Sequence, residues 1–149
     1  MNISEELIKE IVAKVCANMD CGDVPFERTK LTNGMMGIKT DTVVCGDFPF
    51  DIGDANAGTK LLDVVTLEES PNLGIGIMEM DHAEFPWTLN YDECEYIIDG
   101  EIHLKSEKGT IVAKAGDITY IPNGTSIHFC APDHVRFLYI SYPADWANQ

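Results

Sequence analysis

FPWTLNYDECEYIIDG, residues Phe85 to Gly100, is the stretch of this sequence that decides the fold. Asp99 and Gly100 at its end favour a two-residue type I′ turn, because both central positions of that turn need positive φ. We therefore predict a β-hairpin there, with a strand entering it from about Glu93.

Side chains alternate along a strand, and this places two carboxylates on the same face. Glu93 and Glu95 point to one side of the sheet, whereas Cys94 between them points to the other. If their face lines a barrel interior, the two carboxylates repel and raise each other's pKa. They then need a cation, a shared proton or a hydrogen-bonding ligand.

Composition limits the kind of protein. With 149 residues, 45% of them hydrophobic, the chain is expected to form one domain of ordinary size. Ten Lys+Arg against 25 Asp+Glu give a net charge of -15, which argues against a nucleic-acid or anionic membrane surface. The five cysteines include no CxxC pair, and the start MNISEELIKE lacks a leader pattern. We therefore expect reduced thiols and a cytoplasmic location, and we expect no membrane segment.

The first segment has a helical pattern. Its apolar residues recur at helical spacing on one stripe: Ile3, Leu7, Ile8, Ile11, Val12, Val15 and Met19. We predict an amphipathic α-helix within residues 1–22, which packs on the following domain or docks on a partner.

Residues 23–149 have the pattern of an all-β domain. Short extended segments alternate with turn residues, and no helical pattern lies between them. The expected strands, besides those of the hairpin, are Asp41–Cys45, Lys60–Leu67, Gly74–Met80, Thr110–Ala113, Asp117–Ile121, Ser126–Cys130 and Val135–Tyr142. This pattern predicts an antiparallel sandwich or barrel.

Two spacings resemble the signature motifs of the cupin superfamily. In the first, six residues separate Glu93 from Gly100. In the second, five residues separate Gly116 from Pro122, and one more residue separates Pro122 from Gly124. The resemblance implies a cupin double-stranded β-helix, a jelly-roll barrel whose mouth usually holds a metal.

The histidines of the cupin metal site are absent from their expected positions. Trp87 and Leu89 stand where two histidines would precede Glu93, and Ile127 stands where a third would follow. His128 is one position late, so its ring should point to the opposite face. Since Zn and Fe prefer several imidazole or thiolate ligands, we expect no transition metal and no cupin histidine site.

The residues near the expected mouth suggest a different site. Trp87, Tyr91 and Tyr120 are predicted to surround it, with Glu93 and Glu95 at its floor. The aromatic residues either fill the core or contact a ligand. Carboxylates alone suit a hard ion such as Mg²⁺, for which Glu93 is the candidate ligand.

Three longer strings carry a closer resemblance: FPWTLNYDE, AKAGDITYIPNGTSIHF and VRFLYISYPADW. They resemble the EutQ family of ethanolamine-utilisation proteins over about residues 40–146. The resemblance implies an acetate kinase that uses ATP, and a part in bacterial microcompartments.

Our site hypothesis assigns catalysis to Glu93 and Glu95, with Mg²⁺ on Glu93, and substrate contacts to Trp87, Tyr91 and Tyr120. Two alternatives are a non-enzymatic microcompartment component that docks on shell or cargo proteins, and a metal-free cupin that binds a small molecule. We also expect a homodimer, paired through Asp41–Cys45 or through the C-terminal strand.

Overall fold

The computed structural model describes residues 24–149, so the helix expected within residues 1–22 lies outside the described part. The chain divides into two compact units between Val44 and Cys45. In the first, strands β1 (Arg28–Lys30) and β2 (Met36–Ile38) form an antiparallel ribbon, followed by a 3-10 turn, η1 (Thr40–Thr42).

The strand expected over Asp41–Cys45 is therefore wrong. The Thr42 hydroxyl donates a hydrogen bond to the Lys39 carbonyl three residues earlier, and this local bond favours a turn. The same hydroxyl accepts a hydrogen bond from the Glu27 N–H.

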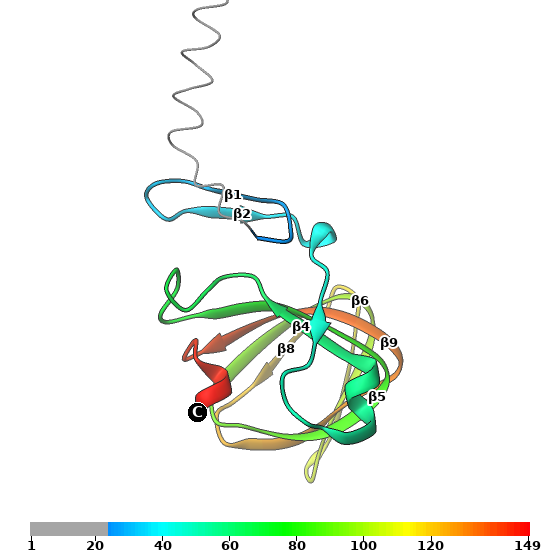
Figure 1. Cartoon of the computed structure of the whole chain (residues 1–149). Helices are drawn as coiled ribbons and strands as arrows, with labels where there is room; N and C mark the ends of the chain where they lie inside the picture. Colours follow the sequence, from blue (N-terminus) through cyan, green and yellow to red (C-terminus); the bar gives the residue numbers. More distant parts are fainter. Residues whose placement is uncertain (1–23) are drawn as a thin grey trace, which may run out of the picture. The chain divides into compact units, whose positions relative to one another are not determined.

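The second unit, Cys45–Gln149, is an antiparallel β-barrel (Figure 1). Its strands run in the order β3-β4-β5-β9-β6-β7, and β8 pairs with β6. The elements are β3 (Gly46–Asp47), η2 (Gly53–Gly58), β4 (Thr59–Asp63), β5 (Gly74–Leu89), β6 (Asp92–Ser106), β7 (Gly109–Lys114), β8 (Ile118–Ile121), β9 (Thr125–Tyr142) and η3 (Trp146–Asn148). The all-β jelly-roll prediction is confirmed.

Three long strands run through both halves of the barrel. The C-terminal part of β9 pairs with the first parts of β5 and β6, and its N-terminal part pairs with their second parts. The register shifts at Asp81/Ala83 in β5, and at Ile97/Asp99 and Gly100/His103 in β6. Such irregularities bend strands, and here they mark where each strand passes from one half to the other.

The hairpin predicted at Asp99-Gly100 is wrong. The strand β6 continues through both residues, and the hairpin comes later, where Ser106 pairs with Gly109. Gly100 does have a positive φ of 76°, but it serves a bend rather than a turn. A Cβ there would lie 2.0 Å from the His134 carbonyl oxygen, so a side chain has no room.

Two histidines connect the neighbouring strands β5 and β9 close to this bend. His82, with a φ of 44°, has its Nδ1 2.9 Å from the Pro132 carbonyl oxygen. His134 Nδ1 lies 2.8 Å from Asp81 Oδ1. These histidines therefore link β5 to β9 at the corner, away from the barrel interior.

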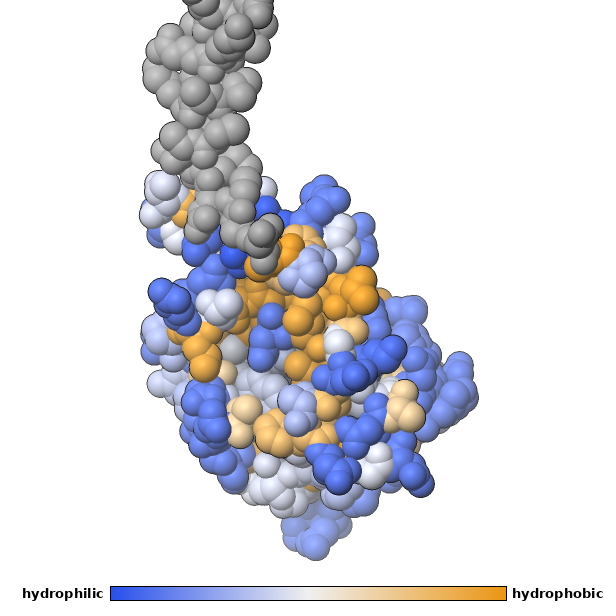
Figure 2. Space-filling model, in the orientation of Figure 1, coloured by the Kyte–Doolittle hydropathy of each residue, from blue (hydrophilic) through white to orange (hydrophobic). Residues whose placement is uncertain are grey.

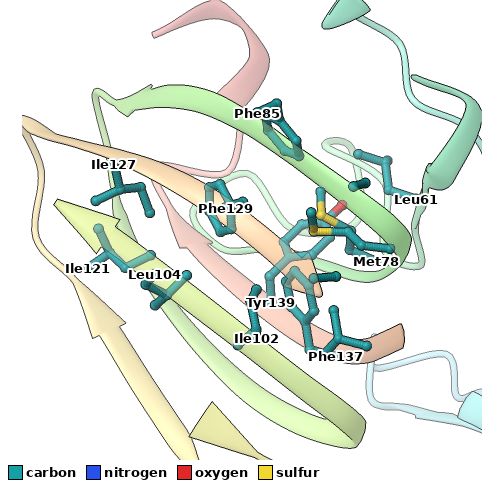
Figure 3. Close-up of a cluster of buried hydrophobic side chains, with 14 of the residues drawn as sticks. Leu61, Met78, Phe85, Ile102, Leu104, Ile121, Ile127, Phe129, Phe137 and Tyr139 are labelled. Carbon is teal, nitrogen blue, oxygen red and sulfur yellow. The ribbon is translucent and has the colours of Figure 1, made fainter. Parts of the chain in front are cut away.

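The core lies between the two halves. Figure 3 shows Phe85 of β5 beside Phe129 of β9, and their ring centroids are 5.5 Å apart. Ile102, Leu104, Ile121 and Ile127 extend the same cluster. Burial of these side chains is the main stabilisation of the barrel, at about 1.5–3 kcal/mol for each large apolar residue.

The outer face of the barrel also carries large apolar side chains. Tyr96, Ile118, Tyr120 and Tyr142 are between 45% and 71% exposed. Two of them, Tyr96 and Ile118, are directly paired in the β6–β8 register. Apolar surface is also visible among charged residues on the face drawn in Figure 2. Within residues 24–149, no helix has the length and apolarity that crossing a bilayer requires.

The C-terminal strand cannot supply the free edge expected for a dimer. β9 lies between β5 and β6 along most of its length, so both of its edges are already paired.

We predict that Gly100→Ala lowers the free energy of unfolding by about 3 kcal/mol or more. The substitution puts a side chain at a position with positive φ, and its Cβ clashes with the backbone of His134. Gly116→Ala is the matched control, because Gly116 also has a positive φ of 94° but no atom within 4 Å of its added Cβ. Urea unfolding of both variants measures the difference, and equal losses would contradict the close approach at Gly100.

Candidate functional site

A small cavity lies inside the barrel. Most of its lining is aromatic, and the full set is Phe48, Met78, Phe85, Trp87, Tyr91, Glu93, Phe129, Phe137, Tyr139 and Trp146. The cavity is small, with a volume of about 20 Å³. The cavity therefore suits a ligand of only a few heavy atoms.

Trp87 and Trp146 connect the rings of the aromatic wall. Their ring centroids are 6.3 Å apart, and each also lies within 6 Å of the Phe50 ring. The Trp87 indole N–H donates a hydrogen bond of 2.9 Å to the Tyr91 hydroxyl. Because its polar groups are paired with each other, this part of the wall offers mainly ring surface to a ligand.

Asp63 fixes the opposite part of the wall from β4. Its Oδ1 accepts hydrogen bonds from the Tyr139 hydroxyl at 2.6 Å and from the Trp146 indole N–H at 3.3 Å. Gly76 lies under the Tyr139 ring, and a Cβ at Gly76 would come within 2.2 Å of its hydroxyl oxygen. The absence of a side chain at Gly76 thus lets Tyr139 reach Asp63.

Glu93 and Glu95 both lie inside the barrel, as the alternation along β6 predicts. Glu93 lines the cavity and is 6% exposed, and Glu95 is completely buried. The Thr119 hydroxyl of β8 donates a hydrogen bond of 2.5 Å to Glu95 Oε2. Glu95 Oε1 has no hydrogen-bond partner among the described residues. The pair is therefore buried with little polar compensation.

Burial shifts the acid–base behaviour of this pair. Desolvation, followed by repulsion from Glu95, raises the pKa of Glu93 well above its usual range. Desolvation raises the pKa of Glu95 to about 7, although the hydrogen bonds from Thr119 and Glu93 oppose the shift. A proton shared by the two carboxyl groups therefore explains how they coexist. Burial also raises the pKa of Tyr91 and Tyr139, so both hydroxyls stay protonated.

The structure brings together four of the five residues expected at the site. Trp87, Tyr91 and Glu93 line the cavity and Glu95 lies beside Glu93. Tyr120 does not line the cavity, so its expected position is wrong. It pairs with Cys94 on the outer face, is 64% exposed and donates a hydrogen bond to Asp92. Its neighbour Thr119 takes the inward position, one residue earlier on β8.

Apolar side chains occupy the positions of the cupin metal ligands. Leu89 and Ile127 are buried and Trp87 lines the cavity. His128 faces outward as predicted, with its Nδ1 3.3 Å from Glu84 Oε1.

Mg²⁺ does not fit between Glu93 and Glu95. It needs a near-octahedral set of oxygen ligands and keeps several waters, whereas the rest of this small cavity is aromatic or apolar. Across residues 24–149, no group of three or more His, Cys, Asp or Glu side chains could hold a metal ion. The assignment of Mg²⁺ to Glu93 therefore has no support in this geometry.

Sequence reasoning missed several residues of the cavity wall. Phe48 and Asp63 lie in segments with weak periodicity, and nothing local marks them. Tyr139 could have been found, because it alternates inward along β9 with Phe137 and Val135. Trp146 lies within the quoted string VRFLYISYPADW, but its return to the barrel in η3 is a tertiary feature.

The jelly roll with its interior site defines a protein of the cupin class. An RmlC-like cupin from Shewanella frigidimarina shares the fold, at 18% identity over 68% of this chain and 90% of that chain, with a TM-score of 0.55. The family model for ethanolamine utilisation protein EutQ matches residues 2–148. The chain belongs to this family.

Named relatives support this membership. "Acetate kinase EutQ" of Clostridioides difficile strain 630 is 41% identical over 99% of this chain and 94% of its own length. The protein of the same name from Salmonella typhimurium is 37% identical over 97% of this chain, which spans 64% of that relative. The solved structure of the Clostridium difficile EutQ protein has a TM-score of 0.80 and 43% identity, covering 85% of this chain and 93% of that one.

The buried carboxyl pair predicts a pH dependence of stability. Because the folded state binds the Glu95 proton more tightly than the unfolded chain, the resulting stabilisation is present below pH 4.5 and is lost as the pH rises through about 7. We expect Glu95→Gln, which stays neutral, to become more stable than wild type by up to about 3 kcal/mol between pH 5 and 8.

Urea unfolding at several pH values measures this difference. Glu107→Gln, on the exposed turn after β6, is the control and should follow the wild type. A Glu95→Gln curve parallel to that of the wild type would show that the carboxyl is not buried as described.

Proposed function

We propose that this chain is an acetate kinase, which interconverts acetate and ATP with acetyl phosphate and ADP. The observation that carries the proposal is the similarity over 99% of the chain to a protein named acetate kinase EutQ. The cavity adds a physical argument, because it has room for a ligand of only a few heavy atoms.

The proposed acetate site lies between Glu93 and the aromatic wall. A protonated Glu93 carboxyl donates a hydrogen bond to one acetate oxygen, and the aromatic rings surround the methyl group. Trp87 and Tyr91 shape this site. Glu95 does not contact acetate but positions Glu93 and sets its protonation, so it is a positioning residue.

The proposed nucleotide site lies outside the cavity, because ATP is far too large for it. An open depression next to the wall is bordered by Phe50, Trp87, Tyr91, Asn90 and Trp146, among others. From there the γ-phosphate can approach the free acetate oxygen. That oxygen forms a new bond to the γ-phosphorus while the bond to the β–γ bridging oxygen breaks, and the electron pair leaves with ADP. Any Mg²⁺ bound to the nucleotide would have phosphate oxygens as ligands rather than Glu93.

A coupled assay of acetate-dependent ADP formation tests this proposal with the purified full chain. We expect Glu93→Met to raise the KM for acetate about tenfold or more, because a hydrogen bond to a charged group is lost. Glu107→Gln is the control and should leave the KM unchanged, because Glu107 lies on an exposed turn outside the cavity. No acetate-dependent activity in the folded wild-type protein, or an unchanged KM in folded Glu93→Met, would refute the assignment.

We also propose a homodimer, now through the outer face rather than through β9. The exposed apolar residues Tyr96, Ile118, Tyr120 and Tyr142 support this interface. Sedimentation at micromolar concentration should give twice 16.5 kDa, and Ile118→Glu should shift the protein to monomer. A wild-type monomer at this concentration would contradict the proposal.

A microcompartment role in the cytoplasm, with docking on shell or cargo proteins by the segment 1–22, stays a proposal. It rests on the family resemblance, and that segment lies outside the described residues.

A further inference from the structure

We propose that the aromatic cavity also binds a small organic ammonium cation, of the class of short primary alkylamines, with its charged nitrogen against Glu93. The proposal uses the same cavity as the proposed kinase but does not depend on the kinase activity. It follows from three features: the ring surface of the wall, the buried carboxyl pair and the size of the space.

The wall has the composition of a cation-binding cage. Aromatic faces attract cations through their quadrupole, and tryptophan does so most strongly. Here the rings of Trp87, Trp146, Phe48 and Phe85 meet at angles between 47° and 83°, so they enclose the space from several directions rather than stacking. The polar groups of Trp87, Trp146 and Tyr139 are already paired, which leaves ring surface for the ligand.

The Glu93–Glu95 carboxyl pair supplies the countercharge inside this cage, and Glu93 is the member of the pair that lines the cavity. It is the one acidic or basic residue in the cavity lining apart from tyrosines, and none of the described lining residues is Lys or Arg. Behind it, Glu95 is completely buried and keeps its Oε1 without a hydrogen-bond partner. An ammonium group at Glu93 would donate a charge-assisted hydrogen bond and compensate the negative charge that this burial leaves uncovered.

Within the part of the chain that the structure describes, the other groups around the pair do not supply a positive charge. Thr119 of β8 donates one neutral hydrogen bond, and Tyr91 and Tyr139 remain protonated. Asp63 of β4 is acidic and is already bonded to Tyr139 and Trp146. The carboxyl pair therefore attracts a cation when it carries one negative charge, and it loses this attraction when both groups are protonated.

The size of the cavity limits which ammonium ions can bind. Room for a ligand of only a few heavy atoms admits ammonium, methylammonium or ethanolammonium, but a tetraalkylammonium ion would need the wall to move. A short primary amine also matches a single carboxyl contact better than a quaternary one, because only the primary amine can donate hydrogen bonds.

The two tryptophans make the test direct. The chain contains two, Trp87 and Trp146, and both line the cavity, so intrinsic fluorescence reports on this site. The full chain is titrated at pH 8 with ethanolamine hydrochloride, with ethylene glycol as the neutral analogue of equal heavy-atom count, and with sodium chloride. We expect a saturable change with ethanolamine alone, and a weaker affinity at pH 6.

Two matched variants test which carboxyl group binds the ammonium ion. We expect Glu93→Gln to weaken ethanolamine binding at least tenfold, and Glu84→Gln, which removes a carboxylate from the outer surface, to leave it unchanged. If Glu93→Gln does not fold, Trp146→Phe and the pH dependence of the wild type test the same site by calorimetry.

Equal responses to ethanolamine and ethylene glycol, binding that strengthens from pH 8 to 6, or unchanged affinity in folded Glu93→Gln would each overturn the proposal. The acetate kinase assay is a separate readout. Amine binding without kinase activity would refute only the proposed function, and kinase activity without amine binding would refute only this inference.

Discussion

Two carboxyl groups buried side by side in an apolar barrel are the constraint on which the rest of this site depends. Water is almost excluded from Glu93 and Glu95, and the Thr119 hydroxyl donates a hydrogen bond to Glu95. The barrel must therefore hold a proton there or admit a compensating ligand. Such an arrangement costs stability, so its location at the cavity rather than in the closed core points to a function.

Local periodicity predicted part of this site and tertiary pairing decided the rest. The inward direction of Glu93 and Glu95 follows from alternation along one strand and needs no knowledge of its partners. Tyr120 could not be placed in this way, because its direction depends on the register of β8 against β6. The role of Gly100 was also ambiguous from the sequence, because a glycine with positive φ is found both in tight turns and in strand bends. The long pairing of β6 with β9 makes Gly100 part of a bend.

The barrel has kept the cupin framework and replaced the chemistry of its mouth. The positions that would carry histidines hold Trp87, Leu89 and Ile127, so the interior presents ring and aliphatic surface there instead of metal ligands. Fold and chemistry are thus separable here, which is why the jelly roll by itself indicates neither a kinase nor an amine receptor. Both proposals rest on the charge state of one carboxyl pair.

The central place of β9 has a consequence for biosynthesis. This strand is the last one along the chain, yet it fills the gap between β5 and β6. During translation, those two earlier strands emerge with open edges and no partner between them. Open strand edges promote association with other chains, so the nascent barrel remains vulnerable until residues 125–142 leave the ribosome.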